Sequence, residues 1–225
     1  TRAATVTNED TILSNIDVLS VASDLDGDAL TVSAATAGNG VISMNGDGTI
    51  NYNPNADYFG TDTINYTISD GNGGSDSSSF TVTVNSFNDA PRPVADSNIV
   101  VEDGSISINV LANDSDVDGT IDHTTVQNVG TALPGDPLEV AGQGNWSVNG
   151  ATGDITFTPG ADYDGVVTDI SYTVADNLGA RSAPATVSVS ITSVNDAPIA
   201  VANTSVVAED SSISINVLAN DTDID

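Results

Sequence analysis

Hydrophobic and polar residues alternate in short runs along the whole chain. The runs 64–69, 80–84 and 187–191 each alternate a hydrophobic residue with a polar one, which is the period of a half-buried strand. Thr, Val, Ile and Tyr dominate these runs, as they do on pleated surfaces. Turn clusters rich in Gly, Asn and Asp, such as 45–48 and 70–74, separate them. About seven short strands per hundred residues predict an all-β fold of Greek-key, Ig-like sandwiches.

The chain also repeats itself. The sequence Asn-Asp-Ala-Pro at 88–91 returns at 195–198, and much of 102–114 returns at 209–221 with the same offset of 107 residues. A repeat of about 100 residues is a whole domain rather than one unit of a solenoid. We therefore predict three segments: repeat 1 at 1–90, repeat 2 at 91–197, and the first strands of a truncated third repeat at 198–225.

The third segment and the middle of repeat 2 depart from a simple tandem. Two strands alone are marginally stable, so we expect 198–225 to be irregular. It is either pinned by Asn195, Asp196 and its own aspartates or paired with a neighbouring molecule. Repeat 2 carries about 13 more residues than repeat 1, most of them near 128–141, and the single tryptophan, Trp146, follows closely.

The net charge of the chain narrows the range of functions that it can have. The 225 residues include 32 Asp or Glu and only 3 Lys or Arg, all of them arginines, which gives a formal charge of -29. Nucleic-acid binding and adhesion to anionic lipid are not expected, because both need basic patches. The absence of cysteine and lysine removes disulfides, thiolate metal sites and lysine chemistry. A charge this large needs salt or bound cations to offset self-repulsion.

Neither a membrane span nor a targeting signal is expected. No run approaches the roughly 18 consecutive apolar residues of a transmembrane helix. The chain begins at Thr1 without an apolar stretch after it, and we expect it to be an internal part of a longer protein.

The acids recur at matched positions beside Gly and Pro, in turns rather than on strand faces. In a seven-stranded sandwich the first strand ends at Glu102 and Asp103, far from the linker, whereas the second strand returns to it. Each junction would then gather acids from the end of one domain, from the linker and from the start of the next. For the first junction we predict Glu9, Asp57, Asn88, Asp89, Asp116, Asp118 and Asp176.

Calcium is the cation that we expect there. Two aspartates ~5 Å apart repel by roughly 3 kcal/mol at an effective dielectric of about 20, so a cluster needs a counter-ion. Ca²⁺ takes 6–8 oxygen ligands in flexible geometry, whereas Mg²⁺ keeps more waters. Lys and Arg are too few to serve.

This ordered set of acids resembles cadherin repeats, and most closely the bacterial cadherin-like tandem repeats of large secreted adhesins of the repeats-in-toxin type. Glu9 and Glu102 resemble the glutamate of x-E-x, and Asp57 and Asp162 the acid of L-D-R-E, although the neighbouring Leu, Arg and Glu are missing. The shortened linkers 88–89 and 195–196, three D-x-D pairs and two A-x-D aspartates complete the match. The candidate ligands are Glu9, Asp10, Asp24, Asp26, Asp57, Asp70, Asn88, Asp89, Glu102, Asp103, Asp114, Asp116, Asp118, Asp162, Asp176, Asn195, Asp196, Asp223 and Asp225.

The resemblance implies a calcium-rigidified extender, extracellular or on the bacterial surface, that projects a distal binding domain. Its partners would be adjacent repeats, and a polysaccharide or another adhesin copy are further options. Catalysis is not expected, since the local carboxylate pairs lie in the context of the metal site and His123 has no nucleophile beside it. An alternative is recognition of a glycan or protein, including homophilic adhesion, through the repeat 2 insertion and Trp146. A purely halophilic acidic surface is a third reading, and it predicts stabilisation by molar NaCl without selectivity for calcium.

Overall fold

The computed structural model describes residues 5–224. The chain divides into two compact units, residues 1–89 and 90–225. Asp225 falls outside the described residues, so its predicted role as a ligand is not addressed by the structure. Within the described residues, no helix is long and apolar enough to cross a membrane.

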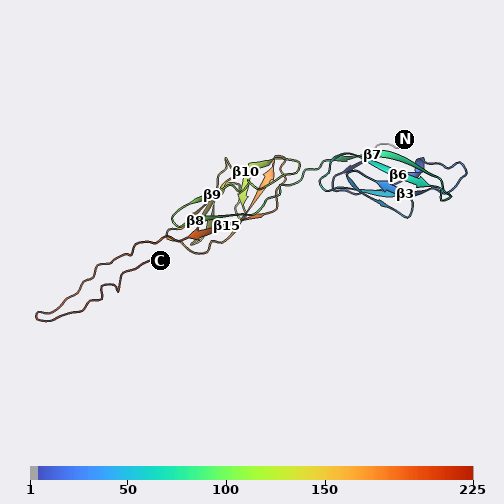
Figure 1. The fold of residues 1–225 in the computed structure, drawn as a ribbon. Coiled ribbons are helices and arrows are strands. Elements are labelled where there is room, and N and C mark those ends of the chain that lie inside the picture. Colours follow the sequence, from blue (N-terminus) through green and yellow to red (C-terminus); the bar gives the residue numbers. More distant parts are fainter. Residues whose placement is uncertain (1–4, 225) are drawn as a thin grey trace. The chain divides into compact units, whose positions relative to one another are not determined.

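Unit 1 is a sandwich of two sheets with seven described strands. The strands are β1 (Thr5–Asn8), β2 (Leu13–Ile16), β3 (Thr31–Thr36), β4 (Gly40–Met44), β5 (Ile50–Pro54), β6 (Gly60–Ser69) and β7 (Ser75–Asn85), and one 3-10 turn, η1 (Leu19–Val21), follows β2. One sheet has the order β1-β7-β6-β3, of which Figure 1 labels the last three, and the other has the order β2-β5-β4. The described pairings are antiparallel except that of β1 with β7, which is parallel.

Unit 2 repeats this architecture and adds a strand. Its strands are β8 (Asp96–Val101), β9 (Ile106–Ile108), β10 (Ile121–Asn128), β11 (Leu138–Val140), β12 (Gly144–Val148), β13 (Ile155–Pro159), β14 (Ile170–Asp176) and β15 (Ala185–Thr192). The sheets have the orders β10-β14-β15-β8 and β11-β12-β13-β9, and β8 pairs with β15 in parallel. Figure 1 labels β8, β9, β10 and β15 of these strands. The predicted all-β fold of tandem Greek-key sandwiches is thus confirmed.

The two hydrophobic cores form because hydrophobic and polar residues alternate strictly along the strands. On β7, Phe80, Val82 and Val84 are buried, whereas the threonines between them are exposed. The core of unit 2 is centred on aromatic residues, among them Trp146 and Tyr172, both fully buried. Burying a side chain of this size stabilises the fold by several kilocalories per mole, because each Å² of apolar surface removed from water contributes about 25 cal/mol. The alternation therefore fixes which face of each strand is inside.

Trp146 belongs to this core and not to a surface. Its exposed fraction is 0%, and its ring centroid lies 4.5 Å from that of Phe157 at an interplanar angle of 38°. The hypothesis that Trp146 contacts a ligand is therefore wrong. Its indole points inward because its position on β12 has the same parity as the other core residues of that sheet.

The extra residues of repeat 2 form a loop and the edge strand β11. Gly144 pairs with Pro159 in unit 2 as Gly40 pairs with Pro54 in unit 1, so β12 corresponds to β4. The insertion thus lies between β10 and β12, where the sequence places it. Strand β11 pairs with β12 and has no counterpart among the described strands of unit 1.

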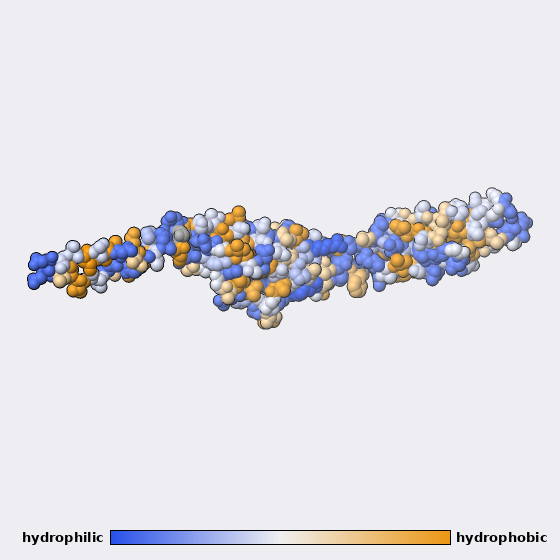
Figure 2. Space-filling model, turned by 90° about the horizontal axis from the view of Figure 1, so that it is seen from below, coloured by the Kyte–Doolittle hydropathy of each residue, from blue (hydrophilic) through white to orange (hydrophobic). Residues whose placement is uncertain are grey.

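The segment 198–224 contains no regular strand. A single bridge joins Ile199 to Thr222, with amide-to-carbonyl distances of 2.8 and 3.1 Å. Val206 and Leu218 are 93% and 72% exposed. In Figure 2 hydrophobic residues lie open at the surface of this part of the chain. Residues that match strand residues of repeat 2 remain irregular here because no sheet is present to pair with them.

Two half-buried acids lie at the β8 edge of unit 2. The hydroxyl of Tyr172 lies 2.8 Å from Asp114 Oδ2, and the amide of Val94 donates to Asp114 Oδ1 at 2.8 Å. Asp96 lies nearby on β8, and its Oδ2 is buried without a hydrogen bond from the described residues. Burial, and secondly the charge of Asp114, raise the pKa of Asp96 to about 6. Burial also raises the pKa of Asp114.

We predict that Asp96→Asn stabilises the protein at pH 7. The folded-state pKa of about 6 lies above the unfolded value of about 3.9, so the folded chain binds more protons between these values. The contribution of Asp96 to stability is therefore full below about pH 4 and is lost as the pH rises to about 6. Thermal unfolding in EDTA should show a higher melting temperature for the variant at pH 7 and a difference that shrinks toward pH 4.

The matched control is Asp122→Asn. A hydrogen bond from the hydroxyl of Thr124 lowers the pKa of Asp122, so its removal should not stabilise the protein at pH 7. The third repeat already has an asparagine, Asn203, at the position that matches Asp96. An Asp96→Asn variant with unchanged or lower stability at pH 7 would contradict the prediction.

Candidate metal centre

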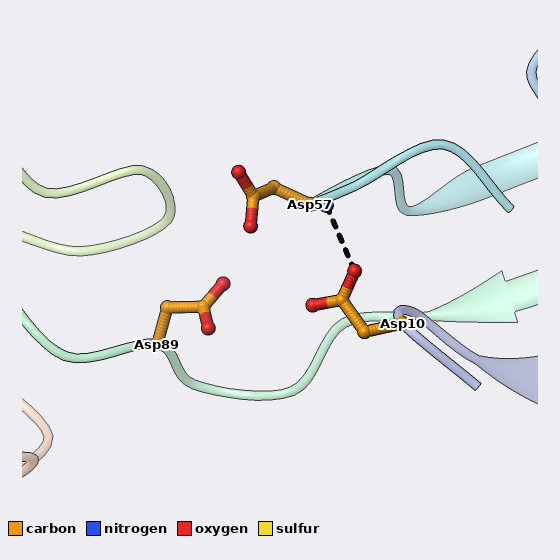
Figure 3. A group of neighbouring side chains, drawn as sticks. All are labelled: Asp10, Asp57 and Asp89. Carbon is orange, nitrogen blue, oxygen red and sulfur yellow. Dashed lines mark hydrogen bonds between the residues drawn. The ribbon is translucent and has the colours of Figure 1, made fainter.

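Three aspartates of unit 1 converge on one point (Figure 3). Asp10 follows β1, Asp57 lies in the turn between β5 and β6, and Asp89 follows β7. One carboxylate oxygen of each lies within 4.8 Å of those of the other two. They meet because β1 and β7 run parallel and so end at the same edge of the sandwich, where β6 begins.

The backbone sets the direction of two of these carboxylates. Asp10 and Asp57 have φ values of 54° and 56°, in the left-handed region. The amide of Asp57 donates to Asp10 Oδ1 at 3.3 Å, which ties the two turns together (Figure 3). Asp and Asn tolerate this conformation better than other non-glycine residues. The repeated Glu-Asp pair is therefore a turn signal as well as a source of charge.

Glu9 lies beside this group and is almost completely buried, with 5% of it exposed. One of its carboxylate oxygens accepts a hydrogen bond from the amide of Phe87. The other, Oε2, is buried and makes no hydrogen bond within the described residues. Glu9, Asp10 and Asp89 line the same pocket, of about 280 Å³. A buried carboxylate oxygen without a partner is costly, and a cation in this pocket would supply one.

Unit 2 repeats the arrangement. Asp103, Asp162 and Asp196 form a second group with carboxylate oxygens within 4.8 Å. Asp103 and Asp162 again have positive φ values, of 58° and 53°, and the amide of Asp162 donates to Asp103 Oδ1 at 3.2 Å. Glu102 is 4% exposed and accepts a hydrogen bond from the amide of Val194.

An aspartate from the third repeat approaches this second group. Asp223 lines a pocket of about 300 Å³ together with Asp162 and Asp196. The bridge between Ile199 and Thr222 holds the chain next to it. Acids from before and after the linker thus border one space in unit 2.

Other predicted ligands lie at the opposite end of unit 1. Asp70 follows β6, and Thr31 pairs with Ser69, so the segment before β3 is at the same end. Asp24 Oδ1 accepts the amide of Asp26 at 2.8 Å. Asp70 Oδ1 accepts the amide of Gly74 at 2.9 Å. Each of these aspartates thus shapes its own turn.

The corresponding acids of unit 2 are more buried. Asp116 Oδ1 accepts the amides of Asp118 and Gly119 at 3.2 and 2.7 Å. Asp116 Oδ2 is buried and without a hydrogen bond from the described residues. Asp176 is 2% exposed, and its Oδ1 accepts the amides of Leu178 and Ala180.

Two of the predicted ligands have other contacts. Asp114 does not lie among the acids of the turn, because it bonds to Tyr172 and to the amide of Val94. The side-chain amide of Asn195 donates to the carbonyl of Asp196 at 2.6 Å, and Asn88 directly precedes Asp89. Asp57 and Asp62 form one of the local carboxylate pairs for which catalysis is not expected, and Asp62 is buried and accepts a hydrogen bond from the hydroxyl of Tyr52 at 2.9 Å. Asp62 thus has a structural role, and His123 is exposed on β10.

The donor set of each group fits a hard divalent cation. Ca²⁺ binds oxygen at 2.3–2.6 Å, so carboxylate oxygens within 4.8 Å of one another can share one ion. Without an ion, two charges 4.8 Å apart repel by about 3 kcal/mol at an effective dielectric of 20, and partial exposure reduces this value. Asp10, Asp57, Asp89 and Glu9 together offer acceptors only, which excludes an anion.

We predict that Asp10→Asn stabilises the metal-free protein. Asparagine keeps the Oδ1 acceptor and tolerates the positive φ of this position, but it removes one of three crowded charges. The melting temperature in EDTA should rise by several degrees, since about 1 kcal/mol corresponds to roughly 4–8 °C in a domain of this size. Asp76→Asn, an exposed aspartate of β7, is the control and should cause a smaller change. A lower melting temperature for Asp10→Asn than for this control would contradict the prediction.

Comparisons with known proteins identify the domains. A family model described as a cadherin-like domain matches residues 1–85, and one described as a bacterial cadherin-like domain matches residues 88–193. No match to a curated protein was found.

Solved cadherin structures are among the matches to this chain. Human CDH23 EC21-23 is 17% identical, with a TM-score of 0.44, and the match covers 87% of this chain and 68% of that one. Human protocadherin-24 EC1-2 is also 17% identical, with a TM-score of 0.41 and coverages of 77% and 86%. The human desmocollin-1 ectodomain is 14% identical, with a TM-score of 0.41, and 79% of this chain spans 37% of it.

The two family models together match most of the chain. Cadherin-like domains are non-enzymatic, extracellular adhesion modules. The protein thus belongs to the cadherin-like family, as a tandem of a cadherin-like and a bacterial cadherin-like domain.

Proposed function

We propose that the chain is a calcium-stiffened extender of a bacterial surface or secreted adhesin. The observation that carries this proposal is the convergence of Asp10, Asp57 and Asp89 beside the buried, unpartnered Oε2 of Glu9. Asp89 is the last residue of unit 1, so an ion held there would bind at the point where the chain leaves the domain.

The repetition of the group supports a role common to successive repeats. The second group, Asp103, Asp162 and Asp196, lies at the matching place of unit 2, and Asp223 borders its pocket. An ion shared by acids on both sides of a linker restricts the linker, because bending it would break metal–oxygen bonds. A series of such linkers makes a stiff rod that holds a distal binding domain away from the cell.

The charge of the chain suits this role outside the cell. Millimolar extracellular calcium would fill the groups after export, whereas the low calcium of the cytosol would leave the carboxylates unscreened and the linkers loose. Binding to the folded state alone stabilises it by about 2.7 kcal/mol when the free ion is at 100 times its dissociation constant. The repeats-in-toxin type of adhesin is the host protein that we propose.

Calcium should raise the melting temperature by roughly 10 °C or more at 100 times its dissociation constant. Calorimetric titration of calcium into protein freed of metal by a chelator measures the affinity for calcium. Thermal unfolding with and without calcium then measures the gain in melting temperature. Asp103→Asn should reduce the gain in unit 2, and Asp154→Asn, which lies outside both groups, should keep it. Equal stabilisation by calcium and by NaCl of the same ionic strength would instead support a purely halophilic surface.

Stiffening is tested separately from binding. We expect small-angle scattering to show a narrower distribution of particle dimensions with calcium than with EDTA. Scattering curves that do not change with chelator, in a protein that binds calcium by calorimetry, would refute the extender role while leaving the metal sites in place.

A further inference from the structure

The insertion of repeat 2 builds a groove on the outer face of unit 2. The groove has a volume of about 820 Å³ and lies between β11, the start of β12 and the turn that follows β13. Volumes of about 300–1,000 Å³ are typical of small-molecule sites. Unit 1 has no counterpart of β11 among its described strands, so the wall that this strand supplies belongs to repeat 2.

A row of polar side chains crosses the floor of this groove. Glu139 pairs with Asn145 across β11 and β12, and Asn145 pairs with Thr158 across β12 and β13. All three are exposed and line the groove. Directly paired residues on one sheet face have Cβ atoms about 4.5–5.5 Å apart, so the three functional groups form a continuous line. Pro137 and Tyr163 also line the groove and add apolar surface to it.

The wall of the groove is fixed before any ligand arrives. Gln143 Oε1 accepts the amide of Thr168 at 2.7 Å, and Gln143 Nε2 lies 3.1 Å from the hydroxyl of Thr168. The carbonyl of Gln143 accepts the amide of Gly160 at 3.0 Å. These bonds join the turn after β11 to Gly160, in the turn that follows β13, and to Thr168, before β14. A rigid site loses little entropy on binding.

The chemical groups of these side chains determine which class of ligand the groove can bind. Among the residues that the structure describes, no lysine or arginine lines the groove, so sulfated, phosphorylated and uronic ligands have no counter-charge from them. Glu139 offers carboxylate acceptors, whereas Asn145 and Thr158 both donate and accept hydrogen bonds. Hydroxyl groups of a sugar do the same, and the C–H faces of a sugar ring suit Pro137 and the Tyr163 ring.

We propose that this groove binds a neutral oligosaccharide, with Glu139, Asn145 and Thr158 as the groups that contact its hydroxyls. The repeat 2 domain would then be a recognition module within the rod. This inference does not rest on the proposed calcium sites, although Asp162 borders the groove. Its test leaves all carboxylates of both acidic groups in place, so either proposal can fail alone.

The experiment screens the whole chain against immobilised neutral oligosaccharides, namely cello-, xylo-, malto- and chito-oligosaccharides of three to six units. Sulfated and uronic oligosaccharides and an oligolysine peptide are included. We expect binding to at least one neutral series, and Asn145→Val and Glu139→Ala should each weaken it by about tenfold or more. Repeat 1 has a valine, Val41, at the position that matches Asn145, so this strand position accepts a valine in the same fold.

The matched control is Asn53→Val, which makes a similar change at the position of repeat 1 that corresponds to Thr158. It should leave binding unchanged, and all variants should keep the wild-type melting temperature within a few degrees. Three outcomes would overturn the proposal. These are binding to no neutral oligosaccharide at millimolar concentration, binding that survives both groove variants, and binding to oligolysine alone.

Discussion

The parallel pairing of the first and last strands of each sandwich is the constraint on which the acidic groups depend. Since β1 and β7 end at the same edge, the Glu-Asp pair after β1 lies beside the linker after β7. The turn between β5 and β6 opens at that edge too, because β6 is antiparallel to β7. Three stretches of chain that are remote in sequence thus place Asp10, Asp57 and Asp89 around one point. Unit 2 reproduces the arrangement through β8 and β15.

A large surplus charge and a stable fold coexist here because the acids are sorted by environment. Some hold turns, as Asp24 and Asp70 do by accepting backbone amides. Asp62 is buried and Asp114 is half-buried, and each accepts a hydrogen bond from a tyrosine hydroxyl. Burial, and then the neighbouring carboxylate, raise the pKa of Tyr52 and Tyr172. Within residues 5–224, only the groups at the linkers combine crowding with acceptors alone, which makes them the places where an ion has the most effect on stability.

The sequence was sufficient for the fold and for the position of the insertion, because alternation and repeated turns act locally. It also placed Asp57 and Asp89 at one end of unit 1, since strand order follows from the sandwich. It could not show that Asp10 rather than Glu9 completes the three-carboxylate group, because that depends on the left-handed backbone at Asp10. It could not show that Asp114 turns inward to Tyr172 or that Trp146 is core, since both depend on packing between sheets. The row of Glu139, Asn145 and Thr158 required the register of three strands.

The same parallel pair determines how a domain responds to mechanical load. The chain enters the sandwich of unit 2 at the start of β8 and leaves this sandwich after the end of β15, and these points lie at opposite ends of the paired strands. Tension along the chain therefore slides β8 and β15 past each other. Six residue pairs, from Val187 with Asp96 to Thr192 with Val101, resist together, whereas a hairpin pulled open at one end would lose its pairs one at a time. The strand pairing that assembles the acidic group is thus also a shear clamp against unfolding by force.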